Sequence, residues 1–156
     1  MPATPVAIAL GSNVGDRASH LAFAVRELSR ILQETRVSPF FDTAPVGVPA
    51  DQPRFLNAAV TGTTHLPPRE LLNELLAIEQ RRGRERPYRF APRTLDLDLI
   101  FYGDQVVMEE GLDVPHPRFR ERLFVLEPLA AIAADWLDPV TGKRVAELFE
   151  KVKREK

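Results

Sequence analysis

The sequence contains no cysteine, which excludes disulfide bonds, thiolate metal sites and cysteine nucleophiles. It also has no long uninterrupted apolar run, and its first residues, MPATPVAIALGS, lack the basic region and the length of a signal or membrane-spanning segment. With 156 residues, of which 44% are hydrophobic and 28% charged, the chain is typical of one compact domain. We therefore expect a single domain over residues 1–156, monomeric and cytoplasmic, with no membrane partner.

Lysine is scarce as well, since 17 of the 21 basic residues are arginines. The formal net charge is only −1, which argues against a general nucleic-acid binder. Six arginines nevertheless fall within 13 residues: Arg81, Arg82, Arg84, Arg86, Arg89 and Arg93. The planar guanidinium fork matches phosphate oxygens, so this cluster indicates a small phosphorylated ligand.

The hydrophobic pattern predicts strands over residues 6–10, 37–41, 55–64 and 95–102. It predicts one helix through Leu21 to Leu32, capped by Asp16 or Ser19, and a second that starts at Pro68 and ends near Gly83. The strand over 95–102 is expected to form a hairpin with residues 105–108. Pro128 is expected to start a further helix, and residues 138–142 to turn into a terminal one.

This order of strands and helices predicts an α+β, ferredoxin-like α/β sandwich. Its mainly antiparallel sheet would carry helices on one face, with ligand loops opposite. Residues 43–54, TAPVGVPADQPR, form a proline-rich connection of the kind often used for binding.

The segment PRTLDLDLIFYG, residues 92–103, places two aspartates at alternating positions of an apolar strand. Asp96 and Asp98 share a strand face, with alpha-carbons roughly 6.6 Å apart, while Leu95, Leu97, Leu99 and Phe101 are expected on the other. Aspartate is unfavourable in strands, and two carboxylates so close repel unless a cation lies between them. Magnesium, which takes one or two carboxylates plus water and phosphate oxygens, fits this pair. An ordinary solvent-facing strand with ion pairs is the alternative.

These residues, together with ALGSNVGDR, FLNAAV and VPHPRFRERLFVLEPL, resemble the 6-hydroxymethyl-7,8-dihydropterin pyrophosphokinases of folate biosynthesis. The resemblance extends from about Ala7 to Ala133 and implies transfer of pyrophosphate from ATP to the hydroxymethyl oxygen of a reduced pterin, with release of AMP. It implies that Asp96 and Asp98 hold two magnesium ions, and that Arg84 and Arg93 act with them in catalysis.

The resemblance also assigns both substrate sites. It implies that Phe55 and Phe124 stack on the pterin and that Asn57 reads its polar edge, although the pattern alone favours core packing for the two rings. The remaining pterin residues implied are Thr43, Ala44 and Val46. For ATP the implied residues are Glu79, Arg84, Arg86, Arg93, Leu99, His116 and Arg122. Without the family, His116 between two prolines reads as an ordinary loop residue.

The chain departs from the family pattern in four ways. The arginine loop is one residue shorter than in some members, Phe90 replaces a common tryptophan, Pro117 a common tyrosine, and Gly111 an occasional arginine. Two other functions fit parts of the sequence. One is a different magnesium-dependent phosphoryl or nucleotidyl transferase, which the nucleotide product would distinguish. The other is a ferredoxin-like RNA-binding domain, which would need exposed aromatics and a basic face.

Overall fold

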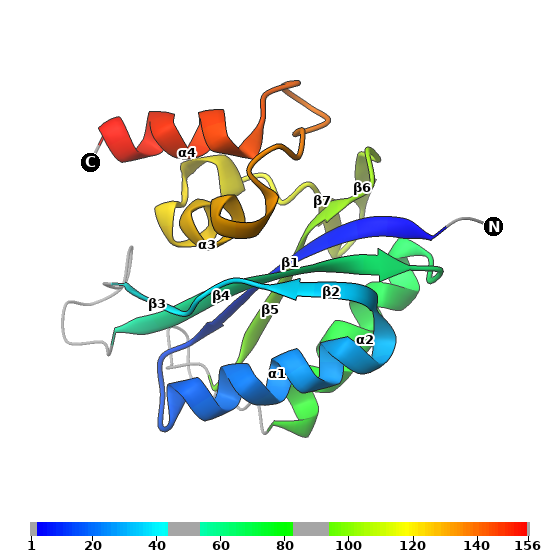
Figure 1. Cartoon of the computed structure of the whole chain (residues 1–156). Helices are drawn as coiled ribbons and strands as arrows, with labels where there is room; N and C mark the ends of the chain where they lie inside the picture. The colour runs from blue at the N-terminus through cyan, green and yellow to red at the C-terminus, as the bar shows by residue number, and fades with distance from the viewer. Residues whose placement is uncertain (1–2, 44–53, 83–93, 156) are drawn as a thin grey trace.

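The computed structural model describes residues 3–43, 54–82 and 94–155. Within these ranges the chain folds into one five-stranded sheet, one small hairpin and four α-helices (Figure 1). The strands are β1 (Thr4–Ser12), β2 (Gln33–Val37), β3 (Phe41–Thr43), β4 (Phe55–Thr64), β5 (Asp96–Tyr102), β6 (Val107–Glu109) and β7 (Leu112–Val114). The helices are α1 (Arg17–Ile31), α2 (Pro68–Arg81), the 3-10 helix η1 (Phe119–Glu121), α3 (Leu123–Ala133) and α4 (Val145–Arg154).

The main sheet has the strand order β2-β4-β1-β5, with β3 pairing along β4 beyond the end of β2. All of these pairings are antiparallel. With α1 following β1 and α2 following β4, the order is that of the split βαβ arrangement. The predicted α+β ferredoxin-like fold is confirmed.

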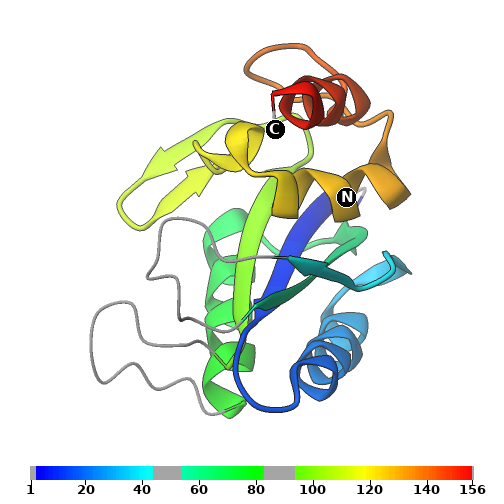
Figure 2. The same cartoon turned by 90° about the vertical axis from the view of Figure 1, so that its left-hand side faces the viewer.

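Side chains on the two faces of the sheet enter two separate cores. Alternate residues of β1, such as Val6, Ile8 and Leu10, pack with α1 and α2. The residues between them face α3 and α4, with Ala7 buried in that core and Ala9 packed against it. Figure 2 shows α3 lying across the sheet with α4 above it. Part of the face that was expected to carry ligand loops is therefore covered by helices.

The first helix and the longest strand follow their sequence signals. Asp16 is the N-cap of α1 and accepts a hydrogen bond from the Ser19 backbone N–H at 3.1 Å, as predicted. The structure confirms β4 at its predicted bounds, Phe55–Thr64, and Pro68 occupies the first turn of α2.

The strand predicted over residues 37–41 is wrong, because β2 ends at Val37 and β3 begins at Phe41. Ser38 interrupts the strand pattern between them. Its backbone N–H donates to the Ala59 carbonyl, and its hydroxyl accepts from the Ala59 N–H, both at 2.9 Å. A side-chain oxygen thus replaces a strand carbonyl, and Pro39 follows with no N–H to donate.

The prediction that Phe101 shares a face with the leucines of β5 is also wrong. Ile8 pairs with Leu99, but Ala7 pairs with Phe101, so Ile100 is an extra residue in β5. This β-bulge reverses the alternation, because two residues oppose one on β1. Phe101 consequently lies in the α3 core, where its ring meets that of Phe119 edge-on at 5.2 Å.

The predicted hairpin between β5 and residues 105–108 does not form. Instead β6 pairs with β7, and Val107 lies opposite Val114. Gly111, with φ +74°, occupies the tight connection between them. A glycine suits that left-handed position. Gly103, with φ +56°, also has left-handed backbone and turns the chain after β5.

Pro128 does not start α3, which begins five residues earlier at Leu123. A proline inside a helix removes one backbone hydrogen bond. Leu126 and Leu129, on either side of Pro128, are buried in the core between α3 and the sheet, and this burial offsets the loss. The turn over residues 138–142 is confirmed, and α4 follows it. Asp138 holds this turn by accepting hydrogen bonds from Arg120 and from the Thr141 hydroxyl.

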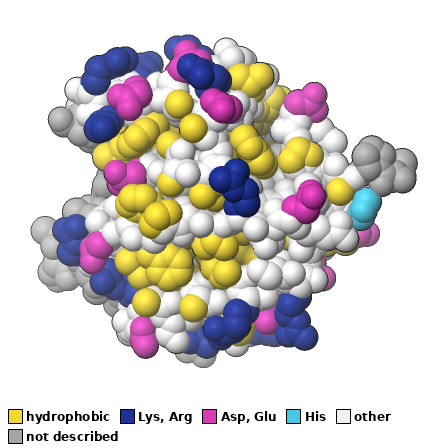
Figure 3. All heavy atoms as spheres, in the orientation of Figure 1, with side chains coloured by type: hydrophobic (Ala, Val, Ile, Leu, Met, Phe, Trp, Pro, Cys, Tyr) yellow, Lys and Arg dark blue, Asp and Glu magenta, His cyan; other side chains and the backbone are white. Residues whose placement is uncertain are grey.

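Charged side chains of both signs cover α4 in the space-filling view, and apolar side chains lie between that helix and α1 (Figure 3). Within the described ranges no helix combines the length and apolar character needed to cross a membrane.

Candidate active site

The two aspartates of β5 lie on the sheet face that also carries α3. Leu95, Leu97 and Leu99 are buried in the opposite core, so the alternation places Asp96 and Asp98 away from it, and both are half-buried. The bulge at Ile100 comes after the pair and leaves their shared orientation unchanged. The predicted division between apolar and acidic faces is therefore confirmed for residues 95–99.

Strand register brings the predicted pterin amide onto the same face as the aspartates. Gly11 of β1 pairs with Asn57 on one side and with Asp96 on the other. Directly paired residues of neighbouring strands share a face, so these three positions form one row across the sheet. In the next row Ala9 separates Ala59 from Asp98. On this face, the small residues Gly11 and Ala9 therefore lie between the amide and the carboxylates.

Gly11 has a specific reason to lack a side chain. A Cβ at this position would lie 3.1 Å from Asn57 Nδ2 and 3.8 Å from Phe55 Cδ1. The glycine thus leaves the surface beside the amide and the ring free of a side chain. The sequence reasoning missed this residue, since GSN by itself indicates only a turn after a strand.

The Asn57 amide is oriented by its neighbour on β3. Thr43 Oγ1 donates a hydrogen bond to Asn57 Oδ1 at 2.6 Å, and Asn57 is buried. This bond fixes which end of the amide is oxygen, so Nδ2 lies on the Gly11 side. The structure thus brings the predicted residues Thr43 and Asn57 into contact, and Phe55, paired with Thr43, is half-buried beside them.

An ion-pair cluster that the sequence did not reveal lies next to this region, on the face of the sheet that α1 covers. Asp42 Oδ1 accepts from Arg54 Nε at 2.7 Å, and Asp42 Oδ2 accepts from Arg17 Nη2 at 3.1 Å. Arg17 Nη1 also donates to the Arg54 carbonyl at 3.0 Å. These bonds join α1, β3 and the residue before β4, next to Thr43 and Phe55. We call Arg17, Asp42 and Arg54 the base clamp.

The start of α3 contributes the second predicted aromatic ring. Phe124 is half-buried near the N-terminus of α3, and α3 packs on β4 and β3. The Arg122 guanidinium carbon lies 5.6 Å from the centre of the Phe124 ring. A predicted phosphate ligand and a predicted pterin ring are thus neighbours, joined by a cation–π contact.

His116 lies close enough to Asp96 for their charges to interact. Burial lowers the pKa of His116, and the neighbouring Arg122 lowers it further, while Asp113 and Asp96 act in the opposite direction. The imidazole is therefore neutral at neutral pH. Its Nδ1 accepts from the Arg118 N–H at 3.2 Å, so the proton is on Nε2, which can donate to an anion.

Glu79 and Leu99 lie on the other side of β5, toward α2. Glu79 is 2% exposed, and its Oε2 accepts a hydrogen bond from the Leu97 N–H at 2.7 Å. Leu99 is 5% exposed in the core formed with α1 and α2. The structure therefore does not place these two predicted ATP residues on the same sheet face as Asp96 and Asp98.

Five predicted site residues lie outside the described residues: Ala44, Val46, Arg84, Arg86 and Arg93. They belong to the two segments that connect β3 to β4 and α2 to β5.

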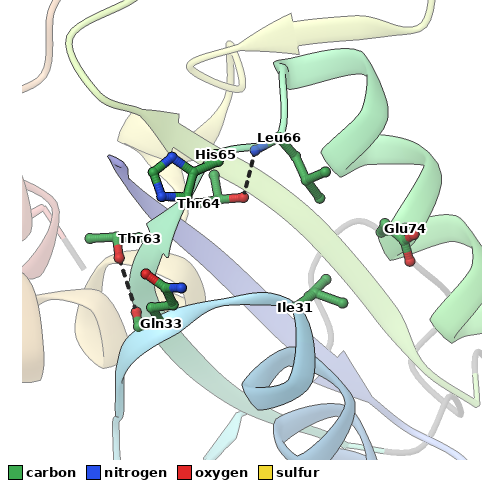
Figure 4. A pocket seen from close by; sticks show the side chains of 7 residues that line it. All are labelled: Ile31, Gln33, Thr63, Thr64, His65, Leu66 and Glu74. Atoms are coloured by element: carbon green, nitrogen blue, oxygen red, sulfur yellow. Dashed lines mark hydrogen bonds between the residues drawn. The ribbon is translucent and has the colours of Figure 1, made fainter. Parts of the chain in front are cut away.

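A cavity of about 360 Å³ lies elsewhere, where the end of β4 meets the start of β2 and α2 (Figure 4). It is lined by Ile31, Gln33, Thr63, Thr64, His65, Leu66 and Glu74. None of these was predicted as a site residue, and Thr63 and Thr64 are at the opposite end of β4 from Phe55.

The carboxylate pair fits a magnesium ion that is completed by substrate. Among residues 3–43, 54–82 and 94–155, no three histidine or acidic side chains gather as an all-protein metal site would require. Two half-buried carboxylates on one face instead supply the one or two ligands that Mg²⁺ takes from a protein when phosphate and water provide the others.

The α+β fold, the carboxylate pair and the neighbouring histidine and arginine suit an enzyme that acts on a phosphorylated substrate. The sequence pattern of the 7,8-dihydro-6-hydroxymethylpterin-pyrophosphokinase family, HPPK, matches residues 7–134. The chain therefore belongs to the HPPK family, whose members are ATP-dependent diphosphokinases.

Two bacterial relatives carry the name 2-amino-4-hydroxy-6-hydroxymethyldihydropteridine pyrophosphokinase. The protein from Synechocystis sp. is 45% identical over 147 residues, which cover 93% of this chain and 74% of the relative. The protein from Pseudomonas aeruginosa is 44% identical over 147 residues, covering 92% and 89%.

Longer relatives contain a similar segment within a larger chain. A mitochondrial folate synthesis bifunctional protein of Arabidopsis thaliana is 48% identical over 134 residues, covering 85% of this chain but 24% of the relative. The crystal structure of a Plasmodium falciparum HPPK-DHPS triple mutant with pteroate superposes with a TM-score of 0.79 at 15% identity. That match covers 99% of this chain and 44% of the other, and it supports the fold alone.

Proposed function

We propose that this enzyme transfers pyrophosphate from ATP to the hydroxymethyl oxygen of 6-hydroxymethyl-7,8-dihydropterin and releases AMP, as a step of folate biosynthesis. The row of Asn57, Gly11 and Asp96 is the observation that carries the proposal. It places an amide that can hydrogen-bond a pterin and a carboxylate that can bind a metal on one sheet face, with only a glycine between them. The names of the two bacterial relatives support the substrate.

The pterin would lie over the Gly11 side of the sheet, between Phe55 and Phe124. An amide whose oxygen already accepts from Thr43 offers its N–H groups to acceptor atoms of the ligand. Stacking between two rings suits a flat heterocycle. The proposed pterin site is completed by Ala44 and Val46.

The nucleotide would cross the edge strand β5. His116, with its proton on Nε2, and Arg122 lie near the aspartate face and suit phosphate oxygens. Leu99 and Glu79 lie on the α2 side of the strand. Arg84, Arg86 and Arg93 complete the proposed set of cationic contacts, which would neutralise the triphosphate.

Asp96 and Asp98 would hold two magnesium ions. When bound, these ions supply charge neutralisation on the phosphate oxygens and polarise the attacking hydroxyl. The chain's own part is to keep the two carboxylates fixed on a strand whose other side is anchored in the core.

In the proposed reaction the hydroxymethyl oxygen forms a bond to the β-phosphorus of ATP as the bond between that phosphorus and the bridging oxygen of AMP breaks. The hydroxyl proton is lost to solvent. The protein's main contribution to catalysis is therefore to align the hydroxymethyl oxygen with the triphosphate and to stabilise the charge that develops between them.

Product analysis tests the proposal directly. Incubation with ATP, magnesium and 6-hydroxymethyl-7,8-dihydropterin should give AMP and the pterin diphosphate in equal amounts. Formation of ADP would instead indicate a different magnesium-dependent phosphoryl transferase.

The metal assignment is tested by Asp98→Asn, which keeps the shape of the side chain and removes its charge. Turnover should fall by about a thousandfold, in line with loss of a charge-stabilising ligand, while the melting temperature stays close to that of the wild type. Asp104→Asn, in the exposed turn after β5, is the matched control. Turnover near wild type in Asp98→Asn would disprove the assignment.

A further inference from the structure

The peptide between the two aspartates is held by a buried carboxylate. Leu97 pairs with Leu10 on the β1 side, and its N–H donates to Glu79 Oε2 at 2.7 Å. Because β5 is the last strand in the order found among the described residues, this N–H has no neighbouring strand there to accept its hydrogen bond. Glu79, in the last turn of α2, therefore takes the place of a missing neighbouring strand.

The side chain of Leu97 is fixed as firmly as its backbone. It is buried in the core together with Leu75 and Ile78 of α2, the helix that carries Glu79. Leu97 is consequently held by α2 through both an apolar contact region and a charge-assisted hydrogen bond. Rotation of this residue would turn Asp96 and Asp98 together, since their alpha-carbons flank it.

We propose that Glu79 is a positioning residue for the divalent-cation site, acting through the Leu97 N–H on the direction of both aspartate side chains. The proposal rests on the metal role of Asp96 and Asp98 described above. It differs from the role implied by the family resemblance, in which Glu79 contributes to ATP binding by itself.

Two substitutions separate the hydrogen bond from the charge. Glu79→Gln keeps an oxygen that can accept from Leu97, whereas Glu79→Met keeps the length of the side chain and removes the acceptor. Glu74→Gln, on the same helix but lining the distant cavity, is the matched control. Manganese binding is followed by the loss of the free Mn²⁺ spin-resonance signal, in the presence of a non-hydrolysable ATP analogue.

Glu79→Met should weaken Mn²⁺ binding about tenfold, as is common when a residue that orients a metal ligand is lost. Glu79→Gln should weaken it about threefold, and Glu74→Gln not at all. Amide exchange at Leu97 should quicken in the same order. Binding of the analogue in excess EDTA, without any metal, should stay within about twofold of the wild type in all three.

Unchanged Mn²⁺ binding in both Glu79 variants would overturn the proposal. So would an equal loss of metal-free analogue binding, because that result would show direct contact between Glu79 and the nucleotide. If Glu79→Met does not fold, Glu79→Gln decides through Leu97 exchange and Mn²⁺ affinity together. Asp98→Asn tests the metal assignment separately from the role of Glu79. Normal Mn²⁺ binding in that variant refutes the assignment of Asp96 and Asp98 as metal ligands, whatever the Glu79 variants show.

Discussion

The ion pair between Arg120 and Asp138 gives the sharpest test of how the turn before α4 is held against η1. Asp138 is fully buried, and it accepts hydrogen bonds from both Arg120 Nε and Nη2, from the Val140 N–H and from the Thr141 hydroxyl. Burial raises the pKa of Asp138, but the hydrogen bonds from Arg120, Thr141 and Val140 outweigh it, so the pKa lies below its ordinary value.

Removing one partner of a buried pair leaves the other charge uncompensated, which costs about 3–5 kcal/mol. Asp138→Asn retains one oxygen acceptor, so we expect the lower end, about 3 kcal/mol of unfolding free energy. For a chain of this size that corresponds to a fall in melting temperature of about 6–12 °C. Urea unfolding measures the free energy, and calorimetry the melting temperature.

Asp135→Asn is the control, because its side chain is 90% exposed and lies 3.6 Å from Arg144. It should change stability by less than about 0.5 kcal/mol. Since the folded pKa of Asp138 is lowered, its contribution is present above the unfolded pKa and is lost as the pH falls through the folded one. A loss below about 1 kcal/mol for Asp138→Asn would refute this account of the pair.

Three further predictions concern the site and its borders. Gly11→Ala should raise the KM for the pterin about tenfold, because its new methyl group displaces the Asn57 amide; an equal rise in the KM for ATP would contradict this. The base clamp fixes Arg54, the residue before Phe55, so Asp42→Asn should raise the pterin KM about two- to threefold, a small effect because the clamp is exposed; an unchanged pterin KM would contradict this. Burial, and then Arg82, lower the pKa of His20, whose Nδ1 accepts from Arg82 Nε at 2.9 Å. Its stabilisation is therefore present above pH 6.5 and lost as the pH falls through the folded pKa, so His20→Gln should flatten the decline of the urea midpoint between about pH 7 and pH 5; an unaltered decline counts against this.

The features predicted correctly are those that depend only on residues close together in the sequence. Asp16 caps α1 through a neighbour three residues away, and the alternation of Leu95, Asp96, Leu97 and Asp98 defines two faces without reference to any other strand. Both predictions are confirmed for that reason.

Features that depend on register were not predictable in the same way. Ile100, Phe101 and Tyr102 are all apolar, so no polar residue marks the point at which the bulge reverses the alternation. The row of Asn57, Gly11 and Asp96 joins three strands that are far apart in the sequence. The base clamp likewise depends on the pairing of β3 with β4 and on the start of α1.

The small residues beneath α3 set the distance between that helix and the sheet. Ala7 and Ala59 are buried in the α3 core and Ala9 packs against it, so the helix rests on methyl groups. Larger side chains at these positions would lift α3 and carry Phe124 away from the sheet that holds Asn57. Protein engineering could therefore alter the spacing between α3 and this part of the sheet by replacing only the alanines that lie under the helix.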